Sequence, residues 1–220
     1  MKTQEKNFDG IKLSGFTAIL IMLALTGTAI YLLSLPQTPS IIAGVICGIC
    51  VVVMLPGFMI IQPNNSRVLT FFGRYAGTVI SNGFYWVNPL FLKSTVTLRI
   101  LNLNIDPIKV NDKVGNPIMI GAVVVWRIKD TYKASFDISG NIREFVQIQS
   151  DAALRQVAGM YAYDTNETID KVTLRSDESG EITQRLEDEL NSRLAIAGIE
   201  IVEARINYLA YASEIASVML

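Results

Sequence analysis

Histidine is absent from this sequence of 220 residues, and cysteine occurs only at Cys47 and Cys50. The lack of histidine removes the usual general base and the imidazole ligands of most zinc and haem sites. Both cysteines lie in an apolar run, where a charged thiolate is disfavoured, so their CxxC spacing indicates small packing residues rather than a redox pair. We expect no cofactor and no metal, and no residue pattern predicts a catalytic site.

Charge is scarce in the first part of the chain and balanced in the rest. Residues 1–61 carry only five charged side chains, all within the first twelve positions. Residues 62–220 hold the other 16 Lys and Arg and 18 Asp and Glu. Because phosphate binding requires a strongly basic face, this balance argues against nucleic acid as a partner.

Two long apolar runs lie in the part of the chain that carries no charge. Gly15–Leu35 and Ile41–Ile61 are each 21 residues long, carry no charge, and are separated only by Pro36–Ser40. A helix of 21 residues is about 32 Å long, close to the thickness of the hydrocarbon core of a bilayer. The sequence therefore predicts a transmembrane helical hairpin over residues 15–61, with the lipid bilayer as a partner.

The flanking charges predict the orientation of this hairpin. Lysines precede it, Arg67 and Arg74 follow it, and the turn carries no charge. The positive-inside rule then places residues 1–14 and the large domain in the cytoplasm, at the inner (plasma) membrane. Pro56-Gly57 interrupts the second run near its end and leaves two alternatives, a two-pass hairpin and a re-entrant one.

The remaining residues predict an α+β domain, with strands first, then helices, then a returning strand. Strand-like runs extend from Gln62 to about Ile128, with a hairpin turn at Asn82-Gly83 and a bulge or bend where the alternation within Thr95–Ile105 changes phase. Helices are expected after Asn141, over Asp164–Leu174 and over Glu178–Ala197. The expected domain covers residues 62–210, and residues 211–220 begin a C-terminal helix.

Several stretches resemble the SPFH or band 7 domain of stomatins, prohibitins, flotillins and their bacterial relatives. The resemblance covers about Gln62–Leu220, and the hairpin before it is similar to that of a bacterial branch of the family. The stretches that carry it include Phe72-Gly73-Arg74-Tyr75, Gly83-Phe84-Tyr85-Trp86-Val87-Asn88-Pro89, Val123-Val124-Val125-Trp126-Arg127, Gly198-Ile199-Glu200-Ile201 and Tyr211-Ala212-Ser213-Glu214-Ile215-Ala216.

The resemblance implies a membrane-anchored, non-catalytic scaffold that forms homo-oligomers, organises membrane patches and regulates partner membrane proteins. The alternatives are a regulatory subunit of a membrane protease complex, with the protease or an accessory membrane protein as partner, and, from another class, an enzyme or a channel. Family members usually continue past Glu214–Ala216 into a long helix that drives ring assembly. This sequence stops at Leu220, which predicts a fragment or a short variant.

Three residues are candidates for contacts of such a scaffold. Trp86 and Phe91 belong to an aromatic-rich stretch soon after the hairpin, and we expect them at the membrane interface, with core packing as the alternative. Arg155 lies among apolar residues of a predicted helix. It is the candidate for an oligomer contact, with a local salt bridge as the alternative.

Overall fold

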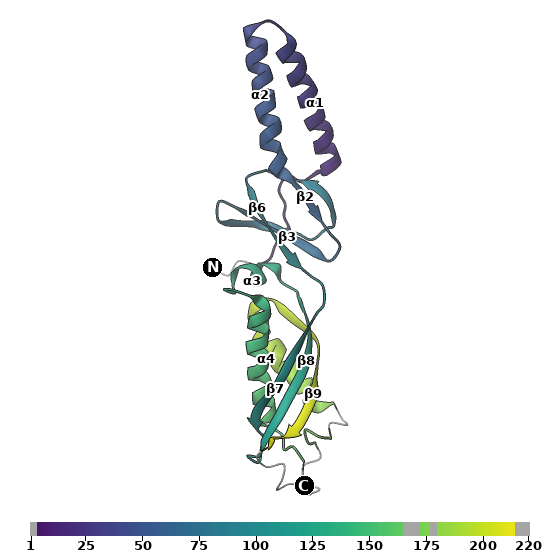
Figure 1. Ribbon diagram of the computed structural model, residues 1–220, viewed down its shortest axis with the longest axis vertical. Coiled ribbons are helices and arrows are strands. Elements are labelled where there is room, and N and C mark those ends of the chain that lie inside the picture. Colours follow the sequence, from purple (N-terminus) through teal and green to yellow (C-terminus); the bar gives the residue numbers. More distant parts are fainter. Residues whose placement is uncertain (1–3, 165–171, 177–179, 214–220) are drawn as a thin grey trace. The chain divides into compact units, whose positions relative to one another are not determined.

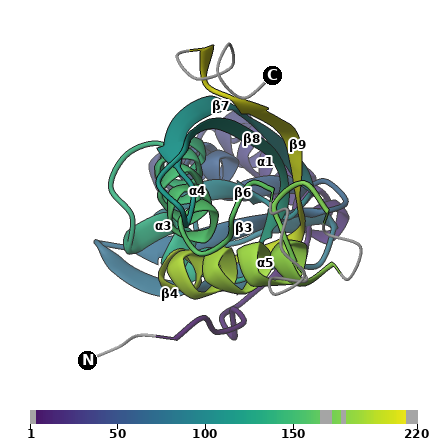
Figure 2. The ribbon, with the colours of Figure 1, turned by 90° about the horizontal axis from the view of Figure 1, so that it is seen from below.

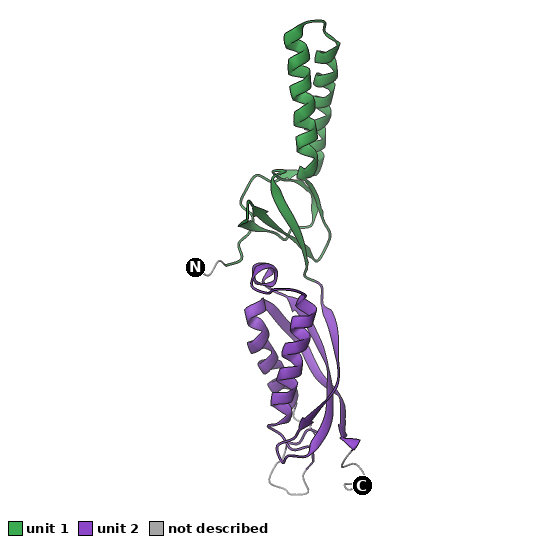
Figure 3. Ribbon diagram, turned by 60° about the vertical axis from the view of Figure 1, so that its left-hand side comes forward, with its two compact units in different colours: residues 1–98 green, residues 99–220 purple. Residues whose placement is uncertain are grey.

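The computed structural model describes residues 4–164, 172–176 and 180–213. The chain divides into two compact units, Met1–Leu98 and Arg99–Leu220 (Figure 3). Each unit has its own strands and its own core, and each is described by itself below.

The first unit carries the hairpin of helices. The helix α1 spans Gly15–Ser34 and α2 spans Thr38–Met54, and the two helices pack against each other (Figure 1). Gly44 of α2 is buried against α1, where an added Cβ would lie 2.8 Å from Cγ of Leu33. The small residue therefore allows the two helices to approach closely.

The second helix ends earlier than the apolar run predicts. A 3-10 turn, η1, covers Leu55–Gly57, and residues Phe58–Ile61 form the strand β2. Whether Phe58–Ile61 still belongs to the membrane segment stays a prediction, but the helical part of the hairpin stops before Phe58. The reason is Pro56, which cannot donate the backbone hydrogen bond that would continue the helix.

Two small antiparallel sheets follow the hairpin in the first unit. One has the order β1-β5-β2, with β1 at Leu13–Ser14 and β5 at Gly83–Trp86. The other has the order β4-β3-β6, with β3 at Asn65–Phe71, β4 at Arg74–Val79 and β6 at Phe91–Thr97. Their shared core consists of buried apolar side chains: Met59, Ile61, Leu69, Val79 and Val87.

The hairpin predicted at Asn82-Gly83 is wrong. The strands on either side of it, β4 and β5, belong to different sheets and do not pair. The tight turn lies instead between β3 and β4, at Phe72 (φ 45°) and Gly73 (φ 81°). Positive φ at both central residues is the geometry of a type I′ turn, which matches the twist of paired strands.

Residues before the first helix are built into this unit. The backbone N–H of Phe8 donates to the carbonyl of Thr78 (3.0 Å), and the N–H of Thr78 donates to that of Lys6 (2.9 Å). This short parallel pairing covers the edge of β4, and the Phe8 ring packs against the core. Because β1 also pairs with β5, the chain is held in the sheets before it enters α1.

The second unit is a three-stranded antiparallel sheet covered by helices. The order is β7-β8-β9, with β7 at Leu101–Asn111, β8 at Pro117–Ile128 and β9 at Ile199–Tyr211. The helices are α3 (Thr131–Phe136), α4 (Ile142–Ala158) and α5 (Glu181–Leu194), followed by the 3-10 turn η2 (Ala195–Ala197). Seen from below, the strands curve around α4 and α5 (Figure 2).

The core of this unit lies between β8 and the two longer helices. Side chains at alternate positions of β8 are buried, as are those at every fourth position of α5. The residues are Ile118, Ile120, Ala122, Val124 and Trp126 of β8 and Ile182, Leu186, Leu190 and Leu194 of α5. The predicted α+β fold is confirmed.

Individual predictions for the second unit had different outcomes. Asn141 caps α4, since its Oδ1 accepts from the N–H of Arg143 (2.9 Å), and Gly198 ends the α5 region at φ 67°. The phase change within Thr95–Ile105 is a break between β6 and β7, and the boundary of the two units falls there. The predicted helix over 164–174 lies mostly outside the described residues, as do 214–220 of the predicted C-terminal helix; Tyr211 still belongs to β9.

Candidate membrane interface

The helical hairpin exposes apolar side chains over nearly its whole surface. Gly15–Ser34 and Thr38–Gly57 are each 20 residues long, and only 11% of an apolar 18-residue stretch within each is buried. Exposed large side chains include Phe16 (70%), Leu20 (68%), Ile30 (65%) and Val52 (65%). Water-exposed apolar surface costs roughly 25 cal/mol per Å², and soluble proteins rarely expose so much of it contiguously. The hairpin therefore has the surface of a pair of helices in lipid.

The end of α2 is held by side chains from the sheets that follow. The indole Nε1–H of Trp86 donates to the carbonyl of Met54 (2.9 Å), and the ammonium of Lys93 donates to the carbonyl of Pro56. Both carbonyls are among the acceptors that a helix leaves without partners at its C-terminus. Gly57 is required here, because an added Cβ would lie 2.2 Å from Nε1 of Trp86.

The start of α1 is fixed to the same strand. An added Cβ at Gly15 would lie 2.3 Å from the ring of Phe84 on β5. That ring also contacts Phe16 edge-on (centroids 5.5 Å apart) and stacks on Phe58 (5.6 Å). Because β5 contacts both the entry and the exit of the hairpin, the two helix ends lie together at one side of the first unit.

The two predicted interface residues are both half-buried. Trp86 uses its indole N–H on the end of α2, and Phe91 lies between Phe8 (5.4 Å) and Phe71 (5.3 Å). They are therefore packed at the junction rather than fully exposed, and whether either touches lipid stays a prediction.

Sequence reasoning missed the most exposed apolar side chains of this region. Phe72 at the β3–β4 turn is 78% exposed, and Leu90 (57%) and Leu92 (68%) flank the start of β6. Phe71 pairs with Phe91 across the sheet, and its ring touches that of Phe72 at 4.8 Å. The sequence signals for these side chains were the Phe71-Phe72-Gly73 run, where an exposed turn carries large apolar residues, and the aromatic-rich stretch that runs into β6 and includes Leu92.

Arg155, the predicted oligomer contact, is exposed on α4. Its Nη1 donates to the carbonyl of Lys109 on β7, an edge strand, at 3.5 Å. Burial raises the pKa of the neighbouring Asp151, while the Arg155 charge lowers it and the Asp106 charge raises it. The structure thus shows a contact of Arg155 within its own chain, and its role between chains remains a prediction.

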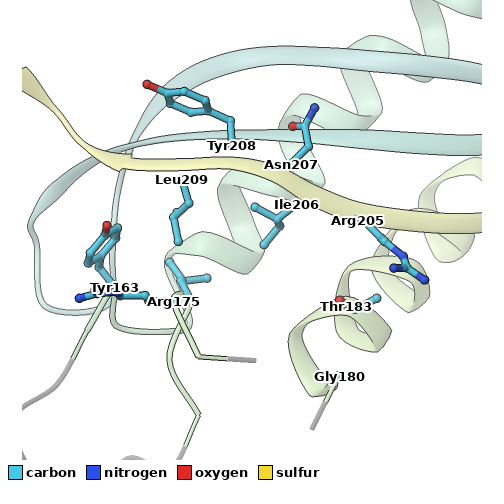
Figure 4. A pocket seen from close by; sticks show the side chains of 10 residues that line it. Tyr163, Arg175, Gly180, Thr183, Arg205, Ile206, Asn207, Tyr208 and Leu209 are labelled. Atoms are coloured by element: carbon cyan, nitrogen blue, oxygen red, sulfur yellow. The ribbon is translucent and has the colours of Figure 1, made fainter. Parts of the chain in front are cut away.

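A hollow lies in the second unit, beside β9 (Figure 4). Its volume is about 790 Å³ and it is lined by Tyr163, Arg175, Arg205 and Leu209 among others. Both arginines already have carboxylate partners, since Arg175 pairs with Asp164 (2.8 Å) and Arg205 with Glu203. Within the described ranges, no group of three or more His, Cys, Asp or Glu side chains could hold a metal ion. This hollow therefore offers no uncompensated charge and no metal-ligand set.

Comparison with known proteins agrees with the fold of the residues that follow the hairpin. The model of the SPFH domain / Band 7 family matches residues 59–219, which include β2, all later strands and helices α3 to α5. A search of curated proteins found no match. Since the family model covers most of the chain, the protein belongs to the SPFH domain / Band 7 family.

Proposed function

We propose that this protein is a membrane-anchored scaffold that assembles with copies of itself and organises lipids and partner membrane proteins. The observation that supports this most directly is the uncharged helical hairpin, whose two ends are fixed to one strand, β5. Family membership supports the same function, because the family comprises membrane scaffolds and protease regulators.

The geometry of the hairpin favours two crossings over a re-entrant path. The 20 residues of α1 give a length of about 30 Å, enough to span the hydrocarbon core. The break at Pro56 occurs where α2 ends, not in the middle of the helix. The cations that flank the hairpin then orient both ends toward the cytoplasm at the inner (plasma) membrane.

The edge of β9 is the surface that we assign to contacts between copies. The first half of this edge is occupied by α5: Asn191 Oδ1 accepts from the N–H of Ile201 (3.0 Å), and Glu187 Oε1 from that of Ala204 (3.1 Å). Within the described part of the chain, α5 makes no such contact with the second half of this edge, around Leu209, which borders the hollow lined by Tyr163 and Arg175. An open strand edge pairs readily with another chain. Arg155, at the opposite edge of the sheet, is the second candidate.

The mass of the detergent-solubilised protein tests this proposal. We expect species larger than a monomer, measured by light scattering with the detergent contribution subtracted. The variant Leu209→Pro should lower this mass, because proline has no backbone N–H to donate to the strand of a neighbouring copy. A strictly monomeric wild-type protein would contradict the assembly part of the proposal while leaving the membrane anchor in place.

A further inference from the structure

Two cations lie side by side just beyond the end of α2. Arg67 of β3 pairs with Thr95 of β6, and Leu69 pairs with Lys93, so Arg67 and Lys93 are diagonal neighbours on one face of the sheet. Lys93 donates to the carbonyl of Pro56, and Nη2 of Arg67 donates to that of Ile60 at 3.5 Å. Both acceptors are neutral backbone groups, so these bonds leave both charges uncompensated.

No carboxylate of the described residues forms an ion pair with either cation. In the second unit, by contrast, Arg127, Lys129, Arg175, Arg193 and Arg205 each pair with a carboxylate. Nε of Arg67 is buried without a hydrogen-bond partner. Burial and the charge of Arg67 together lower the pKa of the Lys93 ammonium. Two adjacent cations with unfilled donors and no counter-charge form a site that favours an anion.

The position of the pair indicates which anion is available. The membrane-span candidate formed by α2 and η1 ends at Gly57, and Lys93 contacts Pro56 within its last turn. Headgroup phosphates lie at the end of a span, just outside the hydrocarbon core. Trp86, which binds the carbonyl of Met54, is of the residue type that favours this depth.

We propose that Arg67 and Lys93 form a binding site for the phosphate of an anionic lipid headgroup at the cytoplasmic end of α2. The guanidinium of Arg67 contacts two phosphate oxygens, and Lys93 adds a point charge through the donors that Pro56 leaves free. The site rests on the proposed membrane anchoring, and it would give the scaffold a preference for the lipids that it gathers.

Fluorescence quenching by brominated lipids tests this site in the full chain. The protein is placed in phosphatidylcholine nanodiscs, and brominated phosphatidylglycerol or brominated phosphatidylcholine is added while tryptophan emission is measured. Trp126, buried in the second unit, gives a background common to both lipids, so the difference reports on Trp86. We expect stronger quenching by phosphatidylglycerol, with its relative affinity falling about five-fold for each cation removed by Arg67→Gln or Lys93→Gln. Glutamine retains an N–H that can donate to the carbonyl.

Control variants separate charge from folding. Arg143→Gln removes an exposed cation of α4 in the second unit and should leave the lipid preference unchanged. Lys93→Arg keeps the charge and should retain the preference. Equal preference in wild type and the Arg67→Gln/Lys93→Gln double variant would overturn the site.

The remaining outcomes distinguish a lipid phosphate from a soluble anion, and a failure of the membrane anchoring from a failure of this site alone. Displacement of brominated phosphatidylglycerol by inorganic phosphate would overturn the lipid assignment in favour of a soluble anion, and a lack of displacement supports it. Wild-type protein that does not enter nanodiscs at all would contradict the proposed anchoring. Protein that enters them without preferring phosphatidylglycerol would contradict only this site.

Discussion

The Asp112 side chain accepts four hydrogen bonds at the turn between β7 and β8. Its carboxylate accepts from the N–H groups of Val114 (3.0 Å), Asn116 (2.8 Å) and Tyr163 (3.0 Å), and from the side-chain amide of Asn116 (3.2 Å). Burial raises the pKa of this carboxyl, but the bonds from Tyr163, Asn116 and Val114 outweigh it and lower the pKa overall. This side chain therefore joins the turn to the segment after α4, together with the backbone bond from the N–H of Lys113 to the carbonyl of Tyr161 (3.1 Å).

The lowered pKa of Asp112 predicts acid sensitivity of the second unit. A folded-state pKa below the unfolded one stabilises the fold above the unfolded value, near pH 4, and this stability is lost as pH falls through the folded pKa. Asp112→Asn should cost about 1–3 kcal/mol at neutral pH and remove that acid-dependent loss. Urea unfolding followed by tryptophan fluorescence, with Trp126 as the reporter in this unit and the Trp86 signal subtracted through a Trp126→Phe reference, measures both. Asp137→Asn, at an exposed position, is the control, and equal loss in both variants would contradict the assignment.

Gly57 and Gly48 provide a matched pair of glycines around α2. An added Cβ at Gly57 meets the indole of Trp86 at 2.2 Å, whereas nothing lies within 4 Å of one at Gly48. Gly57→Ala should therefore displace Trp86 from the carbonyl of Met54 and lower stability by about 1–3 kcal/mol. Gly48→Ala should be neutral or stabilising, because alanine is the better helix former. Thermal melts and the tryptophan emission maximum distinguish the two variants. Similar shifts in both would argue against the contact of Trp86 with the end of α2.

Among the structural features, the isolated β-bridge formed by residues 6–8 is the least expected. It covers the edge of β4, and Gly77 (φ 143°) allows the close approach, since an added Cβ would lie 2.7 Å from Cα of Phe8. The Phe8 ring contacts Phe91 and the core of the first unit. The segment thus both protects a strand edge and fills the core.

Phe8→Ala should release this segment. Loss of the ring contacts should expose the peptide bonds around Lys6 and Asp9 to trypsin and Glu-C protease, and should lower stability by about 1–3 kcal/mol, because the ring is only partly buried. Ile11→Ala is the control, since Ile11 is 77% exposed in the same segment. Limited proteolysis of both variants in detergent is the measurement. Unchanged cleavage in Phe8→Ala would show that the backbone pairing with Thr78 suffices to hold the segment.

The sequence predicts elements with local signals and misses pairings that depend on distant strands. The cap at Asn141, the buried face of α5 and the central apolar strand β8 each follow from periodicity, and the structure contains them. Asn82-Gly83 has the local signal of a hairpin turn, yet β5 pairs with β1 and β2 because their side chains complete the core. Which strands pair depends on the whole core, and two residues of turn sequence do not encode it.

The same contrast between local signals and distant pairings applies to the candidate site. Hydropathy predicts the hairpin, and composition points to the aromatic stretch around Trp86 and Phe91. The pairing of Arg67 with Lys93 depends on the register of β3 and β6, which places residues 26 positions apart on one face. The contact between Trp86 and Met54 likewise joins separate elements. Neither could be read from spacing along the chain.

On the scale of the whole molecule, the path of the hairpin decides how the protein sits in the bilayer. Two crossings place the turn at Leu35–Gln37 on the outer side, whereas a re-entrant path keeps it within the membrane or returns it to the cytoplasmic side. Gln37 precedes α2 and is exposed, so a cysteine there reports the position of the turn. Both natural cysteines, Cys47 and Cys50, lie within α2, and replacing each by serine removes their background labelling.

A membrane-impermeant maleimide applied to intact cells should label Gln37→Cys if α1 and α2 both cross. Asn82→Cys, in the exposed loop before β5, is the matched control and should label only after the cells are opened. Labelling of Asn82→Cys alone from outside would reverse the proposed orientation, and labelling of both sites would contradict two crossings. Labelling of Gln37→Cys only after opening would favour the re-entrant path and place the Arg67–Lys93 pair beneath a hairpin held in one leaflet. A two-pass anchor therefore requires that the maleimide labels the turn from outside and does not reach the loop before β5 until the cells are opened.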